Sequence, residues 1–183
     1  MKRVYLIRHG LPEFPGGQRQ CIGSTDLPLS TEGRLQAEDM AVALPQVTAV
    51  FTSPLTRAVQ TAQAICPEIT ILDGLRELDY GRWEGLTFPE IRERYPKLYA
   101  ARGRDLRLQP PGAEEGAEGL ARFSAAMTEA ARRSPGDLAV VAHGGIIALF
   151  MESLTGCWYK PRYCEVICLT WNDFEFIQQE EAP

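Results

Sequence analysis

The chain contains only two histidines, His9 and His143, and both stand in the same local pattern. Each closely follows a short apolar run, residues 4–7 or residues 138–142, and each is followed directly by a glycine. A neutral imidazole with one nitrogen free is a good nucleophile near neutral pH. A histidine that only fills a core needs no glycine behind it, so the repeated pattern favours a functional pair.

Two arginines and a glutamate accompany the histidines. Arg8 directly precedes His9, Arg57 falls in the first turn of a predicted helix, and Glu77 lies in a glycine-flanked loop. A phosphoryl group in transfer spreads negative charge over its oxygens, so its catalysis consists largely of positioning and of donors aimed at those oxygens. Arginine supplies such donors in a planar, charged fork. A carboxylic acid such as Glu77 can give the leaving alkoxide its proton.

A predicted helix start completes this set of residues. Gly144 and Gly145 directly follow His143 and open a predicted helix, where unpaired N–H groups favour an anion. These residue types, in these places, predict the transfer of a phosphoryl group from an ester to a histidine. The chain has no Gly-x-Ser-x-Gly motif, which argues against a serine hydrolase.

The elements that must position these residues alternate along the chain. Strands are expected over residues 4–7, 47–51, 69–72 and 138–142. Helices are expected over residues 30–44, 53–65, 87–95 and 117–133 and from 144 onward. Ser30 and Ser53 are predicted N-caps, Pro54 is predicted at a first helical position, and Pro96 is predicted to stop the helix before it. Residues 10–29, 73–86 and 97–113 are expected to be irregular.

This order predicts an α/β fold in which a mainly parallel sheet is covered on both faces by helices. A hairpin over residues 166–177, turning at Asn172 and Asp173, would add antiparallel edge strands. Residues 1–183 are interpreted as one domain, with residues 97–116 as a candidate lid. Ligands bind at the carboxyl ends of the strands in such sheets, which is where both histidines are expected.

Composition narrows the partners and the compartment. A net charge of −5 without a dense run of Lys and Arg argues against nucleic acid and an anionic membrane. The five cysteines form no Cys-x-x-Cys pair and are interpreted as free thiols, which predicts a cytoplasmic protein. No cluster of Asp, Glu, His and Cys has the spacing of metal ligands, so we expect neither a metal nor another cofactor. The sequence does not define an oligomeric state.

Four blocks of the chain resemble the signature of the histidine phosphatase superfamily, also called phosphoglycerate-mutase-like. They are Val-Tyr-Leu-Ile-Arg-His-Gly at 4–10, Ser-Pro-Leu-Thr-Arg-Ala-Val-Gln-Thr-Ala at 53–62, Leu-Arg-Glu-Leu-Asp-Tyr-Gly-Arg-Trp-Glu-Gly at 75–85 and Val-Ala-His-Gly-Gly at 141–145. They follow the family's order and cover nearly the whole chain. The resemblance implies a three-layer α-β-α sandwich of the phosphoglycerate-mutase-like kind and a metal-independent phosphoric monoester hydrolase without an organic cofactor.

The resemblance also implies a role for each site residue. It makes His9 the nucleophile that forms a phosphohistidine, and it assigns Arg8, Arg57 and His143 to phosphate binding. It makes Glu77 the proton donor for the leaving group. The expected reaction is therefore the hydrolysis of a small-molecule phosphate monoester.

A further segment bears on the substrate. Residues 21–30 are similar to a segment common in α-ribazole phosphatases and their broad-specificity relatives. Ile22 and Gly23 are accordingly expected to contact the substrate, together with the phosphate-binding residues. Gly144 is also expected to contact it, because it opens a predicted helix. This leaves α-ribazole phosphate and sugar phosphates both open as the substrate.

Three alternatives stay open from the residues. Phosphoglycerate-mutase-type transfer is one, although the cofactor-dependent mutases carry a longer insertion in the middle of the chain. A non-catalytic phosphate-binding protein on the same fold is another, and the presence of His9 and Glu77 argues against it. Glu84 is a rival to Glu77 as the acid, but a structural or capping role is favoured for it.

Overall fold

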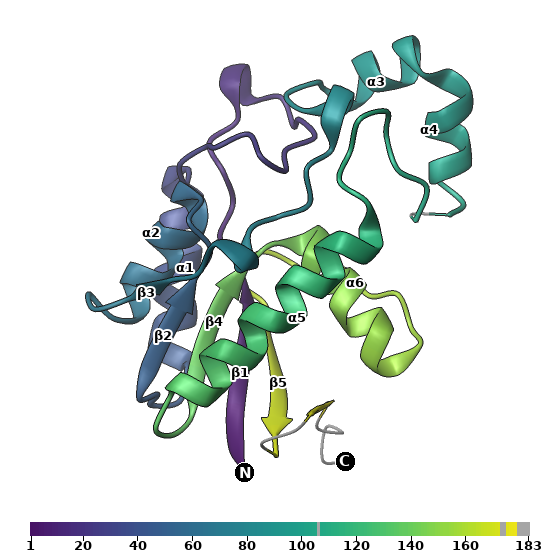
Figure 1. The fold of residues 1–183 in the computed structure, drawn as a ribbon. Coiled ribbons are helices and arrows are strands. Elements are labelled where there is room, and N and C mark those ends of the chain that lie inside the picture. Colours follow the sequence, from purple (N-terminus) through teal and green to yellow (C-terminus); the bar gives the residue numbers. More distant parts are fainter. Residues whose placement is uncertain (106, 173–174, 179–183) are drawn as a thin grey trace, which may run out of the picture.

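A computed structural model describes residues 1–105, 107–172 and 175–178. Its centre is a six-stranded sheet with the strand order β3-β2-β4-β1-β5-β6 (Figure 1). The strands are β1 (Lys2–Arg8), β2 (Ala49–Thr52), β3 (Thr70–Ile71), β4 (Leu138–Ala142), β5 (Val166–Trp171) and β6 (Phe176–Gln178). Strands β1 to β4 pair in parallel, and β5 and β6 pair antiparallel at one edge. The predicted sheet and its edge hairpin are therefore confirmed; Asp173, named for the turn, lies outside the described residues.

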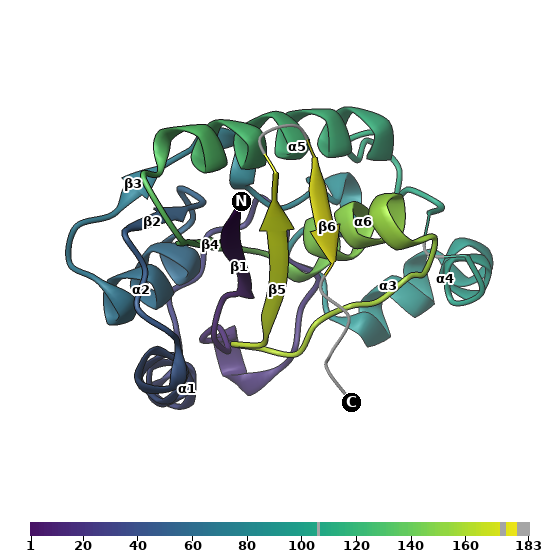
Figure 2. The ribbon, with the colours of Figure 1, turned by 90° about the horizontal axis from the view of Figure 1, so that it is seen from below.

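Helices cover both faces of this sheet (Figure 1 and Figure 2). Helices α1 (Thr31–Ala43) and α2 (Thr56–Ile65) pack on one face, and α5 (Gly116–Arg133) and α6 (Gly144–Thr155) pack on the other. Alternate side chains of β1 enter the two cores: Tyr5 and Ile7 lie with α1 and α2, whereas Val4 and Leu6 lie with α5 and α6. A strand buried on both faces is apolar throughout, as residues 4–7 are. The predicted three-layer α-β-α sandwich is confirmed.

Local signals place two helix starts correctly. Ser30 caps α1, because its Oγ accepts a hydrogen bond of 3.0 Å from the Gly33 N–H. Thr87 and Glu90 form a reciprocal capping box at the start of α3 (Phe88–Arg94). In both cases a side chain satisfies an N–H group that the helix leaves without a partner.

The predicted cap at Ser53 is wrong. Helix α2 begins at Thr56 rather than at Pro54, and the Thr56 N–H donates a hydrogen bond of 2.8 Å to Oδ1 of Asp26. The Ser53 Oγ instead lies 2.7 Å from Nε2 of His143. A contact with a buried histidine engages the serine hydroxyl, and a carboxylate from a distant loop serves the helix start.

The predicted irregularity of residues 97–113 is wrong at its beginning. A second short helix, α4 (Pro96–Arg102), follows α3 after the single residue Tyr95. Pro96 stops α3, as expected, but proline also suits the first position of a helix, where its missing N–H would have no partner. The same residue therefore ends one helix and begins the next.

The carboxyl ends of β1, β2 and β4 meet at one edge of the sheet, and the longer loops gather above it (Figure 1). The loop over residues 10–29 is tied to the segment before α3, because Cys21 exchanges backbone hydrogen bonds with Gly85 and Leu86. Three short 3-10 turns lie in these loops, at Pro15–Gly17, Asp73–Leu75 and Gly81–Trp83. Across the described residues, no helix combines the length and the apolar character needed to cross a membrane.

Candidate active site

His9 directly follows β1, and its ring is buried. Its Nδ1 lies 2.7 Å from the carbonyl oxygen of Gly10, which can only accept, so Nδ1 carries the proton and Nε2 keeps its lone pair. Burial lowers the pKa of His9 well below its ordinary value, and the guanidinium groups of Arg57 and Arg8 lower it further. His9 is therefore a neutral imidazole with one free nitrogen, the form that a nucleophile needs.

His143 directly follows β4, and the centroid of its ring lies 5.0 Å from that of His9. The Ser53 Oγ accepts a hydrogen bond from the Leu55 N–H, so its own proton is available for Nε2 of His143. This favours a proton on Nδ1, which is buried and has no hydrogen-bond partner among the described residues. Burial lowers the pKa of His143 well below its ordinary value, as does the charge of Arg57. His143 thus presents a neutral N–H donor beside His9.

Arg57 is fully buried at the start of α2. Its Nη1 donates to the carbonyl of Thr25 and its Nη2 to the carbonyl of Gly23, each at 2.8 Å. Its Nε is buried and has no hydrogen-bond partner within the described part of the chain. Two loop carbonyls therefore fix the guanidinium and leave its Nε–H without a partner among the described residues.

Arg8 is held in a similar way at the end of β1. Its Nη1 donates to the carbonyl of Pro161 at 2.8 Å, and its guanidinium carbon lies 3.8 Å from the centroid of the Tyr163 ring. Its Nε, like that of Arg57, is buried without a partner in residues 1–105, 107–172 and 175–178. Three unpartnered donors therefore lie beside His9, and an oxyanion is the group that would satisfy them. The sequence analysis did not identify Tyr163, and only its aromatic type could have suggested it.

Glu77 is buried and faces the start of α6. Its Oε2 accepts from the Gly145 N–H and its Oε1 from the Ile146 N–H, each at 2.7 Å. The expectation that the helix start is bare for phosphate is therefore wrong at Gly145, because a carboxylate of this chain already occupies it. Glu77 still lines the same cavity as His9, so the structure brings the two residues together.

Both glycines at the start of α6 allow charged groups to approach closely. A Cβ on Gly144 would lie 2.9 Å from Nε of Arg8, and a Cβ on Gly145 would collide with the Tyr80 hydroxyl. Any larger residue would displace Arg8 or the carboxylate of Glu77. The His-Gly-Gly sequence is thus explained by packing around these two side chains.

A cavity of about 170 Å³ opens over His9. Ile22 lines it, as expected of a substrate contact. Gly23 is not part of its lining; the Gly23 N–H donates to Glu84 and its carbonyl accepts from Arg57. The lining also includes residues that sequence reasoning did not single out and that only their charge or aromatic type could have suggested: Arg19, Tyr80, Lys160 and Tyr163.

Glu84 fixes the loop whose carbonyl groups bind Arg57. Its carboxylate accepts hydrogen bonds from the backbone N–H groups of Gly23, Ser24, Thr25 and Tyr80 and from the Thr25 hydroxyl. Burial by itself raises the pKa of Glu84, but these hydrogen bonds outweigh it and leave the pKa below its ordinary value. These contacts support the structural role over the rival role as an acid. Among the described residues, no group of three or more His, Cys, Asp or Glu could hold a metal.

The family model described as histidine phosphatase superfamily (branch 1) matches residues 4–177. A bifunctional protein of Mycobacterium tuberculosis is 33% identical over 160 residues, which cover 84% of this chain and 41% of that protein. The chain thus spans about two-fifths of the length of this relative and of two further mycobacterial ones.

Solved structures share the fold over nearly the whole chain. A mycobacterial glucosyl-3-phosphoglycerate phosphatase, in complex with VO3, superposes with a TM-score of 0.86 at 26% identity and covers 98% of both chains. An α-ribazole phosphatase from Shigella flexneri superposes with a TM-score of 0.80 at 22% identity, over 97% of this chain and 94% of that one. The family model confirms the predicted resemblance, and both structures confirm the predicted fold. The α-ribazole phosphatase, at 22% identity, bears on the fold alone.

Proposed function

Because the chain belongs to the histidine phosphatase superfamily, we propose that it hydrolyses small-molecule phosphate monoesters through a phosphohistidine on His9. The observation that carries this proposal is the set of three buried, unpartnered donors beside a neutral imidazole. These are Nε of Arg8, Nε of Arg57 and Nδ1 of His143, within the described residues. Two cations and a neutral N–H donor complement the negative charge that the oxygens of a phosphoryl group carry during its transfer.

In the first step Nε2 of His9 attacks phosphorus, and the bond between phosphorus and the alcohol oxygen breaks. Arg8, Arg57 and His143 bind the peripheral oxygens, and Glu77 in its acid form gives its proton to the departing oxygen. In the second step water attacks the phosphohistidine and the P–N bond breaks. Glu77, now a carboxylate, takes a proton from that water, so inorganic phosphate leaves and the free enzyme is restored.

The substrate is a soluble ester small enough for the cavity over His9. Sugar phosphates and α-ribazole phosphate both fit the proposal, and relatives on this fold are named for a glucosyl-phosphoglycerate and for α-ribazole. Mutase-type transfer is the alternative, in which a second substrate hydroxyl and not water receives the phosphoryl group. Release of one inorganic phosphate for each alcohol formed separates hydrolysis from transfer.

The setting of the enzyme follows from the same proposal. We place it in the cytoplasm, where its cysteine thiols stay reduced, with a small-molecule ester and neither nucleic acid nor membrane as partner. Residues 1–183 act as one domain, and residues 97–116 act as its lid, because Arg102, Arg107, Gln109 and Glu115 line a cavity next to the site. No cofactor takes part.

The experiment that tests the mechanism is capture of the phosphoenzyme. Rapid mixing with a phosphate ester, quenching in base and mass spectrometry of the digest should find phosphate on His9, and the label should be lost in acid. His9→Ala should give neither label nor turnover, whereas His143→Gln should slow the reaction with the label still on His9. Full turnover by His9→Ala, or a phosphate on another residue, would overturn the proposal.

A further inference from the structure

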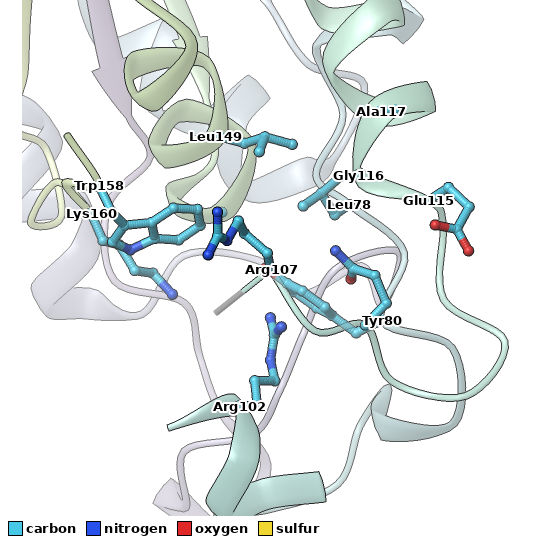
Figure 3. Close-up of a pocket in the computed structure, with 12 residues that line it drawn as sticks. Leu78, Tyr80, Arg102, Arg107, Glu115, Gly116, Ala117, Leu149, Trp158 and Lys160 are labelled. Atoms are coloured by element: carbon cyan, nitrogen blue, oxygen red, sulfur yellow. The ribbon is translucent and has the colours of Figure 1, made fainter. Parts of the chain in front are cut away.

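A second cavity, of about 350 Å³, adjoins the one over His9. Tyr80, Arg102 and Lys160 line both cavities and so mark the junction between them. Figure 3 shows the ends of the Lys160 and Arg102 side chains directed into the same space, with Trp158 to one side and Tyr80 to the other. A substrate bound through its phosphate at His9 would therefore extend past these two cations.

The two cavities hold more positive charge than one phosphate needs. Arg8 and Arg57 with His143 already supply the donors beside His9. Beyond them, Arg19, Arg102 and Lys160 line the first cavity, and Arg102, Arg107 and Lys160 line the second, against the carboxylates of Glu77 and Glu115. The chain as a whole carries a net charge of −5, so this concentration of cations is local. A site of this kind selects for a ligand with additional negative charge.

The cations that line the second cavity differ in the contacts that they already make within the chain. Arg107 pairs with Asp105 at 2.9 Å and is largely exposed. Arg102 donates to the carbonyl of Leu108 and lies 5.6 Å from the centroid of the Tyr80 ring, which fixes its direction. Lys160 makes no hydrogen bond or ion pair with any other residue in the described part of the chain. A carboxylate or a second phosphate at the junction would give the ammonium group of Lys160 its partner.

The rest of the second cavity suits the carbon skeleton of such a substrate. Leu78, Leu149 and Trp158 form an apolar wall. Oε1 of Gln109 is buried and receives no hydrogen bond from the described residues. A hydroxyl group on the substrate could donate to that oxygen. The second cavity therefore offers apolar surface, one hydrogen-bond acceptor and cations at its junction with the first cavity.

We propose that the alcohol portion of the substrate carries a second anionic group, which Lys160 and Arg102 bind at the junction of the two cavities. The inference rests on the proposed phosphatase function and narrows its substrate class to phosphorylated hydroxy acids and bisphosphates. Lys160 and Arg102 then determine specificity, and Arg8, Arg57 and His143 bind the phosphate that reacts.

Matched pairs of esters test this subsite. The substrate D-3-phosphoglycerate differs from sn-glycerol 1-phosphate only by a carboxylate in place of a hydroxymethyl group. The same difference separates 6-phosphogluconate from sorbitol 6-phosphate. The wild-type protein should show a higher kcat/KM for the acid in at least one pair. Lys160→Gln and Arg102→Gln should each lower kcat/KM for that acid roughly 10-fold more than for its neutral partner, the worth of one charge-assisted hydrogen bond. Lys160→Arg should keep most of the preference.

Two control variants remove the same charges elsewhere. Lys97→Gln and Arg104→Gln alter exposed residues of the same region that line neither cavity, and they should leave the ratio within each pair unchanged. Equal losses of kcat/KM on the acid and on the neutral ester would overturn the proposal, since the cations would then only attract phosphate. A wild-type protein that prefers the acid in neither pair would overturn it as well. Turnover of p-nitrophenyl phosphate that depends on His9 would show that the phosphatase function holds even when the subsite proposal fails. Without such turnover, the phosphatase function and this inference would both be wrong.

Discussion

The Oγ of Ser53 lies 2.7 Å from Nε2 of His143, although 90 positions separate the two residues. This contact favours a proton on Nδ1 of His143, the nitrogen that can then donate to a phosphoryl oxygen. Ser53→Ala should lower kcat/KM by about 10-fold, as expected from a hydrogen bond worth about 1.4 kcal/mol in the transition state. Steady-state kinetics on one ester measures the effect.

A second buried serine gives the control for that variant. Ser134 is as deeply buried as Ser53, but it bonds Thr48 and Gly136 at the opposite end of the sheet. Ser134→Ala should lower the free energy of unfolding and leave kcat/KM near that of the wild type. If Ser53→Ala and Ser134→Ala reduced activity alike, Ser53 would only stabilise the fold.

The buried histidines make stability depend on pH. Both folded-state pKa values are lowered by burial and by nearby arginines, so each imidazole takes up a proton on unfolding once the pH falls below its ordinary pKa of about 6.5. The unfolded chain then binds more protons, and the free energy of unfolding falls with decreasing pH. The slope approaches about 1.4 kcal/mol per pH unit for each histidine.

Urea unfolding between pH 8 and 5.5 checks this expectation. The wild-type protein should be stable and nearly pH-independent above pH 7.5 and lose stability below pH 6.5. His9→Gln should show about half of that decline, because only His143 then titrates in this range. A decline that is the same in both proteins would show that other groups cause it.

The fold was predictable because its signals are local. Apolar runs such as residues 138–142 indicate strands, and Ser30 and Thr87 cap helices through residues only three positions away. The start of α2 could not be predicted in this way, because the N–H of its first residue, Thr56, donates to Asp26 from a separate loop. Pro96 was ambiguous for a related reason, since proline is compatible with both the end of one helix and the start of the next.

The site was predictable by residue type but not by contact. The sequence identifies the histidines, the arginines and Glu77, because each ends a strand, follows one or opens a helix. It cannot show that the carboxylate of Glu77 occupies the start of α6, since these groups lie 68 and 69 positions apart. The junction cation Lys160 has no motif around it, and only the meeting of two cavities identifies it.

Glu84 should affect phosphate binding without touching phosphate. Its carboxylate fixes the loop of Gly23 and Thr25, whose carbonyls fix Arg57. Glu84→Gln replaces an ionic acceptor with a weaker amide, so the loop should loosen and Arg57 should bind phosphate less well. The inhibition constant of inorganic phosphate should rise roughly 10-fold, the equivalent of one charge-assisted hydrogen bond.

Glu90→Gln is the matched control for Glu84→Gln. Glu90 also accepts hydrogen bonds from backbone and hydroxyl groups, but it does so within the capping box of α3. Its substitution should lower the free energy of unfolding and leave the phosphate inhibition constant unchanged. Equal inhibition constants in wild type and Glu84→Gln would refute the link from Glu84 to Arg57.

Activity should not depend on a divalent metal. The arginines and His143 supply the electrostatic stabilisation that a metal ion would otherwise provide. Dialysis against a strong chelator should leave kcat/KM unchanged, and vanadate should inhibit as a mimic of the transferred phosphoryl group. Loss of activity on chelation, with recovery on addition of Mg²⁺ or Zn²⁺, would contradict this prediction.

Glu77 must be protonated when the leaving oxygen departs, yet three backbone N–H groups face its carboxylate in the free site. As a general acid, Glu77 acts only on an ester that is bound at His9. Alkyl alcohols are poor leaving groups that need this proton, whereas p-nitrophenolate leaves largely without it. Glu77→Gln should lose roughly 10²–10⁴-fold in kcat on an alkyl phosphate, the usual worth of general acid catalysis, and much less on p-nitrophenyl phosphate.

The ratio of the two rates separates catalysis from structure. Glu77→Gln also replaces one of the two acceptor oxygens at the start of α6 by an amide donor, so this variant should be less stable and both rates should fall somewhat. Only loss of a proton donor makes the alkyl ester suffer more, and the phosphohistidine should still form on His9 with p-nitrophenyl phosphate. Glu84→Gln, measured on the same two esters, should lower both rates in equal proportion. If instead Glu84→Gln gives the selective loss, or Glu77→Gln affects both esters alike, the proton donor is not Glu77.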